Sequence, residues 1–159
     1  MPSKAKSSSN PHSQVLLVDG HKAGLKARCM LLEEAGHHAT GVPSPDEALE
    51  LLRSRTFDII VTEYKFASAN GTEFIAKLRG VAAGVPVILI SGLVDVLGLS
   101  ERTTGADAVL MKGASEPRQL THTVSRLLRM TPAQRARRPA SSEPSATAPR
   151  KVLHAAPGH

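Results

Sequence analysis

The chain has 159 residues, of which 41% are hydrophobic and 21% charged, a composition that is ordinary for one folded domain and excludes collagen-like, coiled-coil and fully disordered proteins. The single cysteine, Cys29, excludes an intrachain disulfide and a multi-cysteine zinc site. No apolar run approaches the roughly 18 residues that span a bilayer. The N-terminus also lacks the apolar core of a secretory signal, so we expect a cytoplasmic protein.

The formal net charge of +6 comes from the two terminal segments. Residues 15–130 hold 13 basic and 13 acidic side chains, so the excess lies in residues 1–14 and 131–159. Both ends are rich in Ser, Pro or Ala and have no sustained apolar pattern, which is typical of disorder. The sequence therefore predicts a disordered arm over 1–13, one domain over 14–130, and a disordered basic tail rich in Pro and Ala over 131–159.

Short apolar runs alternate with helical patterns along this domain. In chain order, the predicted elements are a strand at 14–18, a helix at 22–35, a strand at 37–42, a helix from 45 to about 53, a strand at 57–63, a helix from 71, a strand at 87–91, a poorly patterned helical segment at 93–104, a strand at 108–111 and a helix at 117–130. The clearest helix start is Ser44, where an N-cap residue precedes Pro45 and Glu47.

Continuous apolar strands separated by helices indicate a parallel sheet that is covered on both faces. The predicted fold class is therefore doubly wound α/β. In such sheets, ligands bind outside the carboxyl ends of the strands, near the switch in strand order. Those ends carry Asp19, Glu63, Ser91 and Lys112, and we expect the functional site there.

Four segments of the sequence resemble the receiver domain of bacterial two-component response regulators. They are VLLVDG at 15–20, EALELLRSRTFDIIVTEYKFASANGTEFIAKLR at 47–79, VPVILISG at 85–92 and GADAVLMK at 105–112. The resemblance extends over residues 14–130, and the segments follow the order of the family. It implies a flavodoxin-like, five-stranded parallel sheet with strand order 2-1-3-4-5 and helices on both faces.

The resemblance also implies a phosphoryl-transfer site. In the family, a histidine kinase donates a phosphoryl group to an aspartate that ends the third strand. Magnesium is held by that aspartate and an acidic pair after the first strand, while a hydroxyl group and a lysine contact the phosphoryl oxygens. In this sequence, Asp19 matches the first acid of the pair, Ser91 the hydroxyl residue and Lys112 the lysine.

Three positions depart from the family pattern. Gly20 stands in place of the second acid, Glu63 in place of the phosphoacceptor aspartate, and Val109 in place of the aromatic switch residue. Affinity for a hard cation depends on the number of anionic oxygens that converge on it, so we expect no resident cofactor, and weakened Mg²⁺ binding if Asp19 binds the ion at all. The departures suggest a degenerate receiver, or pseudo-receiver.

Glu63 carries one methylene more than aspartate, so its carboxylate extends farther from the strand end. We expect it to reach towards Lys112 and Ser91, and the hypothesis is that Glu63 stands in permanently for a phosphorylated aspartate. An inert glutamate at a strand end and true phosphorylation of Glu63 are the alternatives. Lys112 has an alternative role as well, in which it is a loop lysine that pairs with Asp19.

The sequence predicts a stand-alone, single-domain protein of phosphorelay signalling that acts by contact with a histidine kinase or a downstream effector, and that is not an enzyme. One alternative is a Mg²⁺-dependent receiver that a histidine kinase still phosphorylates. Another is a regulator whose basic tail binds the phosphate backbone of a nucleic acid. Because the tail has no aromatic residue and no recognition helix, a solvated linker is the favoured interpretation, with no membrane partner and no nucleic-acid partner.

Overall fold

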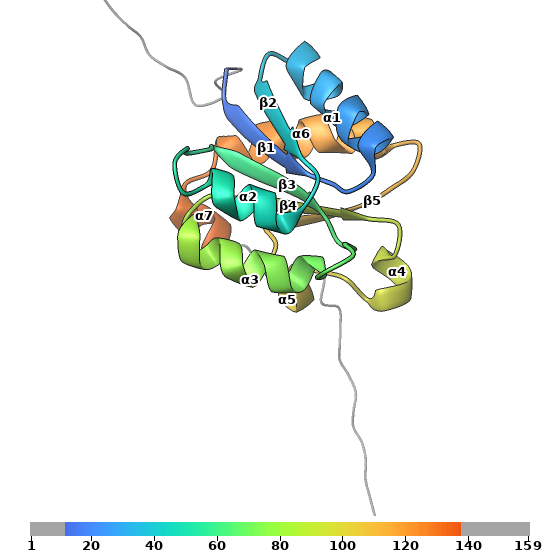
Figure 1. Cartoon of the computed structure of the whole chain (residues 1–159). Coiled ribbons are helices and arrows are strands. Elements are labelled where there is room, and N and C mark those ends of the chain that lie inside the picture. Colours follow the sequence, from blue (N-terminus) through green and yellow to red (C-terminus); the bar gives the residue numbers. More distant parts are fainter. Residues whose placement is uncertain (1–11, 138–159) are drawn as a thin grey trace, which may run out of the picture.

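The computed structural model describes residues 12–137, so most of the predicted N-terminal arm and the tail from residue 138 lie outside the described part (Figure 1). Five parallel strands form one sheet in the order β2-β1-β3-β4-β5. They are β1 (Gln14–Val18), β2 (His38–Val42), β3 (Ile59–Glu63), β4 (Val87–Ser91) and β5 (Ala108–Met111). The predicted strand order and doubly wound fold are confirmed.

Helices cover both faces of this sheet. They are α1 (Lys22–Glu34), α2 (Pro45–Leu51), α3 (Gly71–Val81), α4 (Val94–Leu97), α5 (Glu101–Thr104), α6 (Glu116–Leu128) and α7 (Pro132–Ala136). Figure 1 shows α1 and α6 on one face and α2, α3 and α5 on the other. This arrangement leaves the carboxyl ends of the strands open to the loops that follow them.

The two faces of the sheet form two apolar clusters. Along β1, Leu16 and Val18 pack with the residues beneath α2 and α3, whereas Val15 and Leu17 pack with those beneath α1 and α6. Successive side chains of a strand point to opposite faces, so a sheet covered on both sides needs apolar residues at every position. The continuous apolar runs of the sequence follow directly from this double burial.

The structure differs from the predictions in two segments. Residues 93–104 form two short helices rather than one, because Gly98 adopts a left-handed conformation with φ 63° between α4 and α5. The tail was expected to be disordered from 131, and that expectation is wrong for residues 131–137, which include α7. Thr131 and Gln134 form a capping box at the start of this helix.

Arg135 attaches α7 to the domain. Its guanidinium donates to the carbonyl oxygens of Gly84 and Met130 and lies 3.8 Å from the carboxylate of Asp107. Its side chain is only 8% exposed, so one of the five basic groups of the predicted tail belongs to the folded domain. Within residues 12–137, no helix is long and apolar enough to cross a membrane.

Candidate functional site

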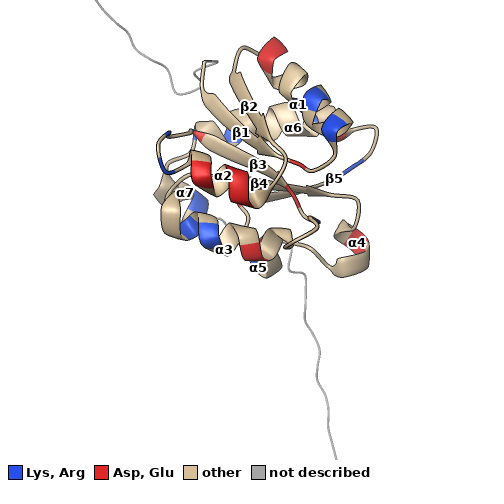
Figure 2. Ribbon diagram, viewed as in Figure 1, with Lys and Arg blue, Asp and Glu red and all other residues tan. Residues whose placement is uncertain are grey.

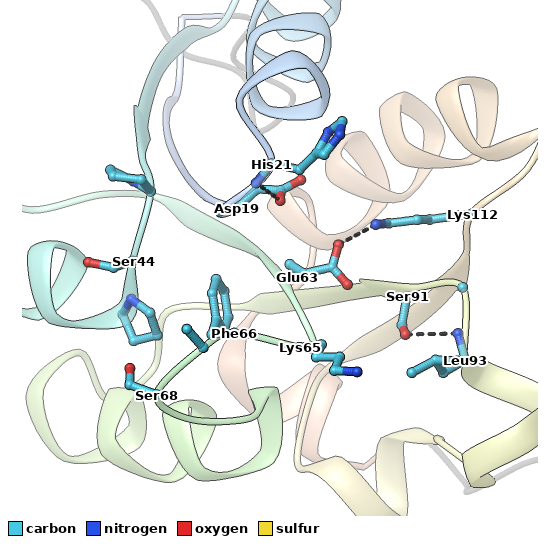
Figure 3. Close-up of a pocket in the computed structure, with 15 residues that line it drawn as sticks. Asp19, His21, Ser44, Glu63, Lys65, Phe66, Ser68, Ser91, Leu93 and Lys112 are labelled. Carbon is cyan, nitrogen blue, oxygen red and sulfur yellow. Dashed lines mark hydrogen bonds and ion pairs between the residues drawn. The ribbon is translucent and has the colours of Figure 1, made fainter.

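A pocket of about 690 Å³ opens at the carboxyl ends of the strands (Figure 3). It contains all four strand-end residues that the sequence singled out, together with parts of the loops after β1, β2, β3 and β4. The lining residues are Asp19, Gly20, His21, Pro43, Ser44, Pro45, Glu63, Lys65, Phe66, Ala67, Ser68, Ser91, Gly92, Leu93 and Lys112. Parallel strands all end at this edge, so side chains from distant parts of the sequence meet in one place.

Glu63 and Lys112 form an ion pair in this pocket. Nζ of Lys112 lies 2.5 Å from Oε1 of Glu63, and Oε2 accepts a hydrogen bond from the backbone N–H of Tyr64 at 3.1 Å. The side chain of Glu63 is 9% exposed and that of Lys112 is 40% exposed. A buried carboxylate is costly unless its charge is compensated, and here one lysine and one backbone amide compensate it. The expected approach of Glu63 to Lys112 is therefore present, whereas Ser91 makes no described contact with Glu63.

Asp19 is held by different partners. Its Oδ1 accepts from the backbone N–H of His21 at 2.8 Å, and its Oδ2 lies 2.8 Å from a guanidinium nitrogen of Arg28. The same guanidinium donates twice to Glu116, with both distances 3.0 Å. Arg28 thus joins the end of β1 to the start of α6, and Lys112 is not the partner of Asp19.

The environment of Arg28 favours its charged form. Burial alone would lower the pKa of Arg28, but the hydrogen bonds and the negative charge of Glu116, together with the charges of Asp19 and Glu63, raise the pKa above its ordinary value. Figure 2 shows the acidic ends of β1 and β3 beside basic residues on α1 and after β5. Arg28 therefore provides a fixed positive charge behind the pocket.

The remaining predicted residues have more ordinary surroundings. The hydroxyl of Ser91 accepts from the backbone N–H of Leu93 at 2.9 Å, which is a turn contact that leaves its proton free to donate. Gly20 lies at the pocket rim with its backbone exposed, and a Cβ added there would meet only a carbonyl oxygen at 3.5 Å. Val109 does not line the pocket and packs against the apolar cluster beneath α3.

The sequence reasoning missed Arg28 and His21. His21 is the N-cap of α1, and its Nδ1 accepts from the backbone N–H of Gly24. Arg28 lies on the same face of α1 as Leu25, Cys29 and Leu32, at the helical spacing that marks the buried side. A charged residue within such an apolar stripe is a usable signal of a buried ion pair, because burial of an unpaired charge is too costly.

The donor set does not fit the magnesium ion that this kind of site implies. Mg²⁺ requires oxygen ligands that converge with near-octahedral geometry. Here both oxygens of Asp19 and both of Glu63 face N–H donors or cations, and Gly20 offers no side-chain oxygen. Within the described residues, no group of three or more His, Cys, Asp or Glu side chains is placed to hold a metal ion.

A doubly wound sheet of this strand order, with an acid, a hydroxyl and a lysine at the ends of successive strands, defines a receiver-type signalling domain. The family model of the response regulator receiver domain matches residues 15–125, and the chain belongs to this family. The family prediction from the sequence is confirmed.

The alignments with two named relatives cover only part of each relative's sequence. The gliding motility regulatory protein of Myxococcus xanthus is 28% identical over 120 residues, which cover 72% of this chain and 15% of that protein. A response regulator receiver protein of Anaeromyxobacter is 29% identical over 107 residues, which cover 66% of this chain and 44% of the relative. The chain therefore spans less than half the length of either relative.

A solved structure matches over its whole domain. The receiver domain of Francisella response regulator 1452 has a TM-score of 0.67 and 27% identity to this chain, and the alignment covers 74% of this chain and 97% of that one. The alignment therefore spans nearly the whole of that receiver domain.

Proposed function

We propose that this protein serves two-component signalling as a receiver that acts by protein contact and without the normal aspartyl phosphorylation. The observation that carries the proposal is the ion pair between Glu63 and Lys112, at the two positions that match the phosphoacceptor and the phosphoryl-binding lysine. The proposed partners are a histidine kinase or a downstream effector.

The pair supplies a contact that otherwise needs a phosphoryl group. A phosphorylated aspartate presents anionic oxygens to the lysine, and the longer side chain of Glu63 presents its own carboxylate oxygen to Lys112 at 2.5 Å. Receiver states that differ by a few kcal/mol can be shifted by one such charged contact, because only differential interactions change a population. Glu63 thus stabilises one state of the domain without phosphoryl transfer.

An exposed apolar surface supports action through a protein partner. Val96 and Leu97 on α4 are 78% and 49% exposed, and Met111 at the end of neighbouring β5 is 38% exposed. Met111 directly precedes Lys112, so the pocket and this surface are joined through the same strand end. Clusters of exposed apolar side chains are typical of interaction sites.

Substitution at the ion pair tests this proposal. We expect Glu63→Gln and Lys112→Gln to shift the amide NMR signals of the same set of residues on α4 and β5, because each variant breaks the same contact. Arg53→Gln is the matched control, since Arg53 forms only an exposed 3.7 Å pair with Glu50 on α2. Spectra in which neither pocket variant changes α4 or β5 would contradict the proposal.

Phosphorylation itself is tested with the wild-type chain. Incubation with Mg²⁺ and a small-molecule phosphodonor such as acetyl phosphate should add no phosphoryl group, as measured by intact-protein mass spectrometry. A mass increase that the Glu63→Gln variant loses would show an active acceptor and favour the rival function, a Mg²⁺-dependent phosphoacceptor.

A further inference from the structure

Arg28 lies where three elements meet behind the pocket. It projects from α1, contacts Asp19 at the end of β1 and contacts Glu116 at the start of α6. All three side chains are largely buried, with 13% of Arg28, 7% of Asp19 and 8% of Glu116 exposed. Two buried carboxylates therefore share one buried guanidinium.

Each carboxylate of this region contacts a cationic side chain of the protein. Arg28 faces Asp19 and Glu116, and Lys112 faces Glu63, so two cations serve three carboxylates. The guanidinium uses Nε and one terminal nitrogen for a forked contact to Glu116, and its other terminal nitrogen for Asp19. Such a fixed planar arrangement of donors suits two carboxylates better than the single point charge of a lysine does.

A small cavity lies behind these groups, separate from the open pocket. The cavity enclosed among Asp19, Arg28 and Glu63 measures about 10 Å³. A single water molecule needs a cavity of roughly 10–15 Å³. This small cavity therefore has no room for a hydrated ion, and in the open pocket of about 690 Å³ that Asp19 and Glu63 also line, their oxygens face Arg28 and Lys112.

We propose that the guanidinium of Arg28 takes the place of the divalent cation of the acidic site. It supplies the positive charge that Asp19 requires, and it makes the folded site independent of metal ions. The inference goes beyond the proposed function, because it concerns Asp19 and the junction of α1 with α6 and does not depend on the role of Glu63. It also explains how a receiver can keep Asp19 when Gly20 has removed the second acid.

A thermal-unfolding comparison tests the proposal. The Tm of the full wild-type chain should be the same in EDTA and in millimolar MgCl₂ at equal ionic strength. Arg28→Gln should lower the Tm by about 10 °C in EDTA, because it leaves buried carboxylates without a counter-charge. Addition of MgCl₂ or MnCl₂ should recover part of that loss, because the oxygens of Asp19 that Arg28 no longer contacts become available to a hard cation.

Two variants make the comparison specific. Arg28→Lys keeps the charge but not the fork, so it should fall between wild type and Arg28→Gln and respond weakly to divalent cations. If Arg28→Gln does not fold, Arg28→Lys takes its place: a lowered Tm with a small gain from divalent cations supports the proposal, and a lowered Tm with no gain counts against it. Arg53→Gln, which removes an exposed guanidinium, should leave both the Tm and the metal response unchanged.

Paramagnetic broadening locates any bound ion. Mn²⁺ should broaden the amide signals of Gly20 and His21 in Arg28→Gln but not in wild type. A wild-type Tm that rises with Mg²⁺, or a destabilised Arg28 variant that gains nothing from divalent cations, would overturn the proposal; in the second case Arg28 is only a clamp between helices. Neither result depends on the Glu63→Gln spectra, so this proposal and the proposed function can fail separately.

Discussion

Each acidic side chain at the strand ends is paired with a cationic side chain of the protein. Glu63 pairs with Lys112 at 2.5 Å and Asp19 pairs with Arg28 at 2.8 Å, so neither carboxylate is left to coordinate an ion. The absence of a side chain at Gly20 removes the third carboxylate that would need compensation. Fixed charge pairs therefore occupy the acidic strand ends, which is the arrangement on which the proposed function rests.

Adding the lost acid at position 20 and shortening Glu63 to aspartate should restore cation binding. In Gly20→Asp/Glu63→Asp, the new Cβ at position 20 has room, since it meets only the carbonyl oxygen of Pro43 at 3.5 Å. The shortened side chain at position 63 no longer reaches Lys112. We expect Mg²⁺ affinity to rise at least about tenfold, measured by calorimetric titration, because position 20 gains a carboxylate and the carboxylate at position 63 is released from Lys112.

The control for this variant is Gly20→Asn/Glu63→Asn, which has side chains of the same shape without the charges. It should bind Mg²⁺ no better than wild type. Equal affinities of the two double variants would mean that the missing carboxylates do not explain the poor fit of the site to magnesium.

His37 should make stability depend on pH. It is 6% exposed, its Nδ1 has no hydrogen-bond partner among residues 12–137, and burial, with a smaller effect of the charge on His12, lowers its pKa. The unfolded chain therefore binds a proton that the folded chain resists, so the free energy of unfolding should fall as the pH drops below the ordinary histidine pKa of about 6.5.

Urea unfolding at a series of pH values measures this effect. His37→Gln should flatten the dependence, whereas His122→Gln, which removes an exposed histidine on α6, should keep the wild-type slope. A wild-type slope that survives in His37→Gln would assign the effect to another group.

The helix α3 shows how elements are fixed at their ends. Asn70 and Glu73 form a reciprocal capping box, with side-chain hydrogen bonds of 3.0 and 3.3 Å to each other's backbone N–H groups. The first residue, Gly71, is buried against Leu89 and Tyr64. The helix start is therefore held by its cap and by close packing on β4, directly after the loop that borders the pocket.

Two glycines of α3 should respond oppositely to alanine. A Cβ at Gly71 would lie 2.7 Å from Leu89 Cδ1 and 3.0 Å from Tyr64 Cα, so Gly71→Ala should destabilise the protein by about 1–3 kcal/mol. At Gly80, no atom lies within 4 Å of an added Cβ and the backbone is helical, so Gly80→Ala should stabilise by about 0.5–1 kcal/mol. Urea unfolding of both variants checks the signs, and equal effects would refute the packing argument.

Helix boundaries were predictable where the signal is local. Ser44 caps α2 as predicted, because its side chain needs only the N–H of Glu47, three residues away. The same kind of signal was present but unused at Thr131, whose partner Gln134 is also three residues away. The break at Gly98 was not predicted, because glycine tolerates a left-handed conformation without requiring it.

For the whole molecule, the doubly wound sheet was predictable from the apolar strands and its strand order from the family resemblance, whereas the two short helices at 94–104, α7 and part of the site were not. Apolar strands determine a doubly wound sheet, and that sheet brings Asp19, Glu63, Ser91 and Lys112 together at one edge. Arg28 escaped prediction because its contact with Glu116 joins residues 88 positions apart, on two helices whose relative placement no local pattern specifies. The attachment of α7 was not predicted for the same reason, because the contact of Arg135 with Gly84 joins residues 51 positions apart.

The most direct test of the account follows the amide NMR signals of the whole chain during addition of Mg²⁺ and then of beryllofluoride, a phosphoryl analogue. We expect the signals of Gly20, Glu63, Ser91 and Lys112 to stay in place, because fixed ion pairs already occupy the site. Saturable shifts at these residues would contradict it, and would establish a working phosphoacceptor pocket instead.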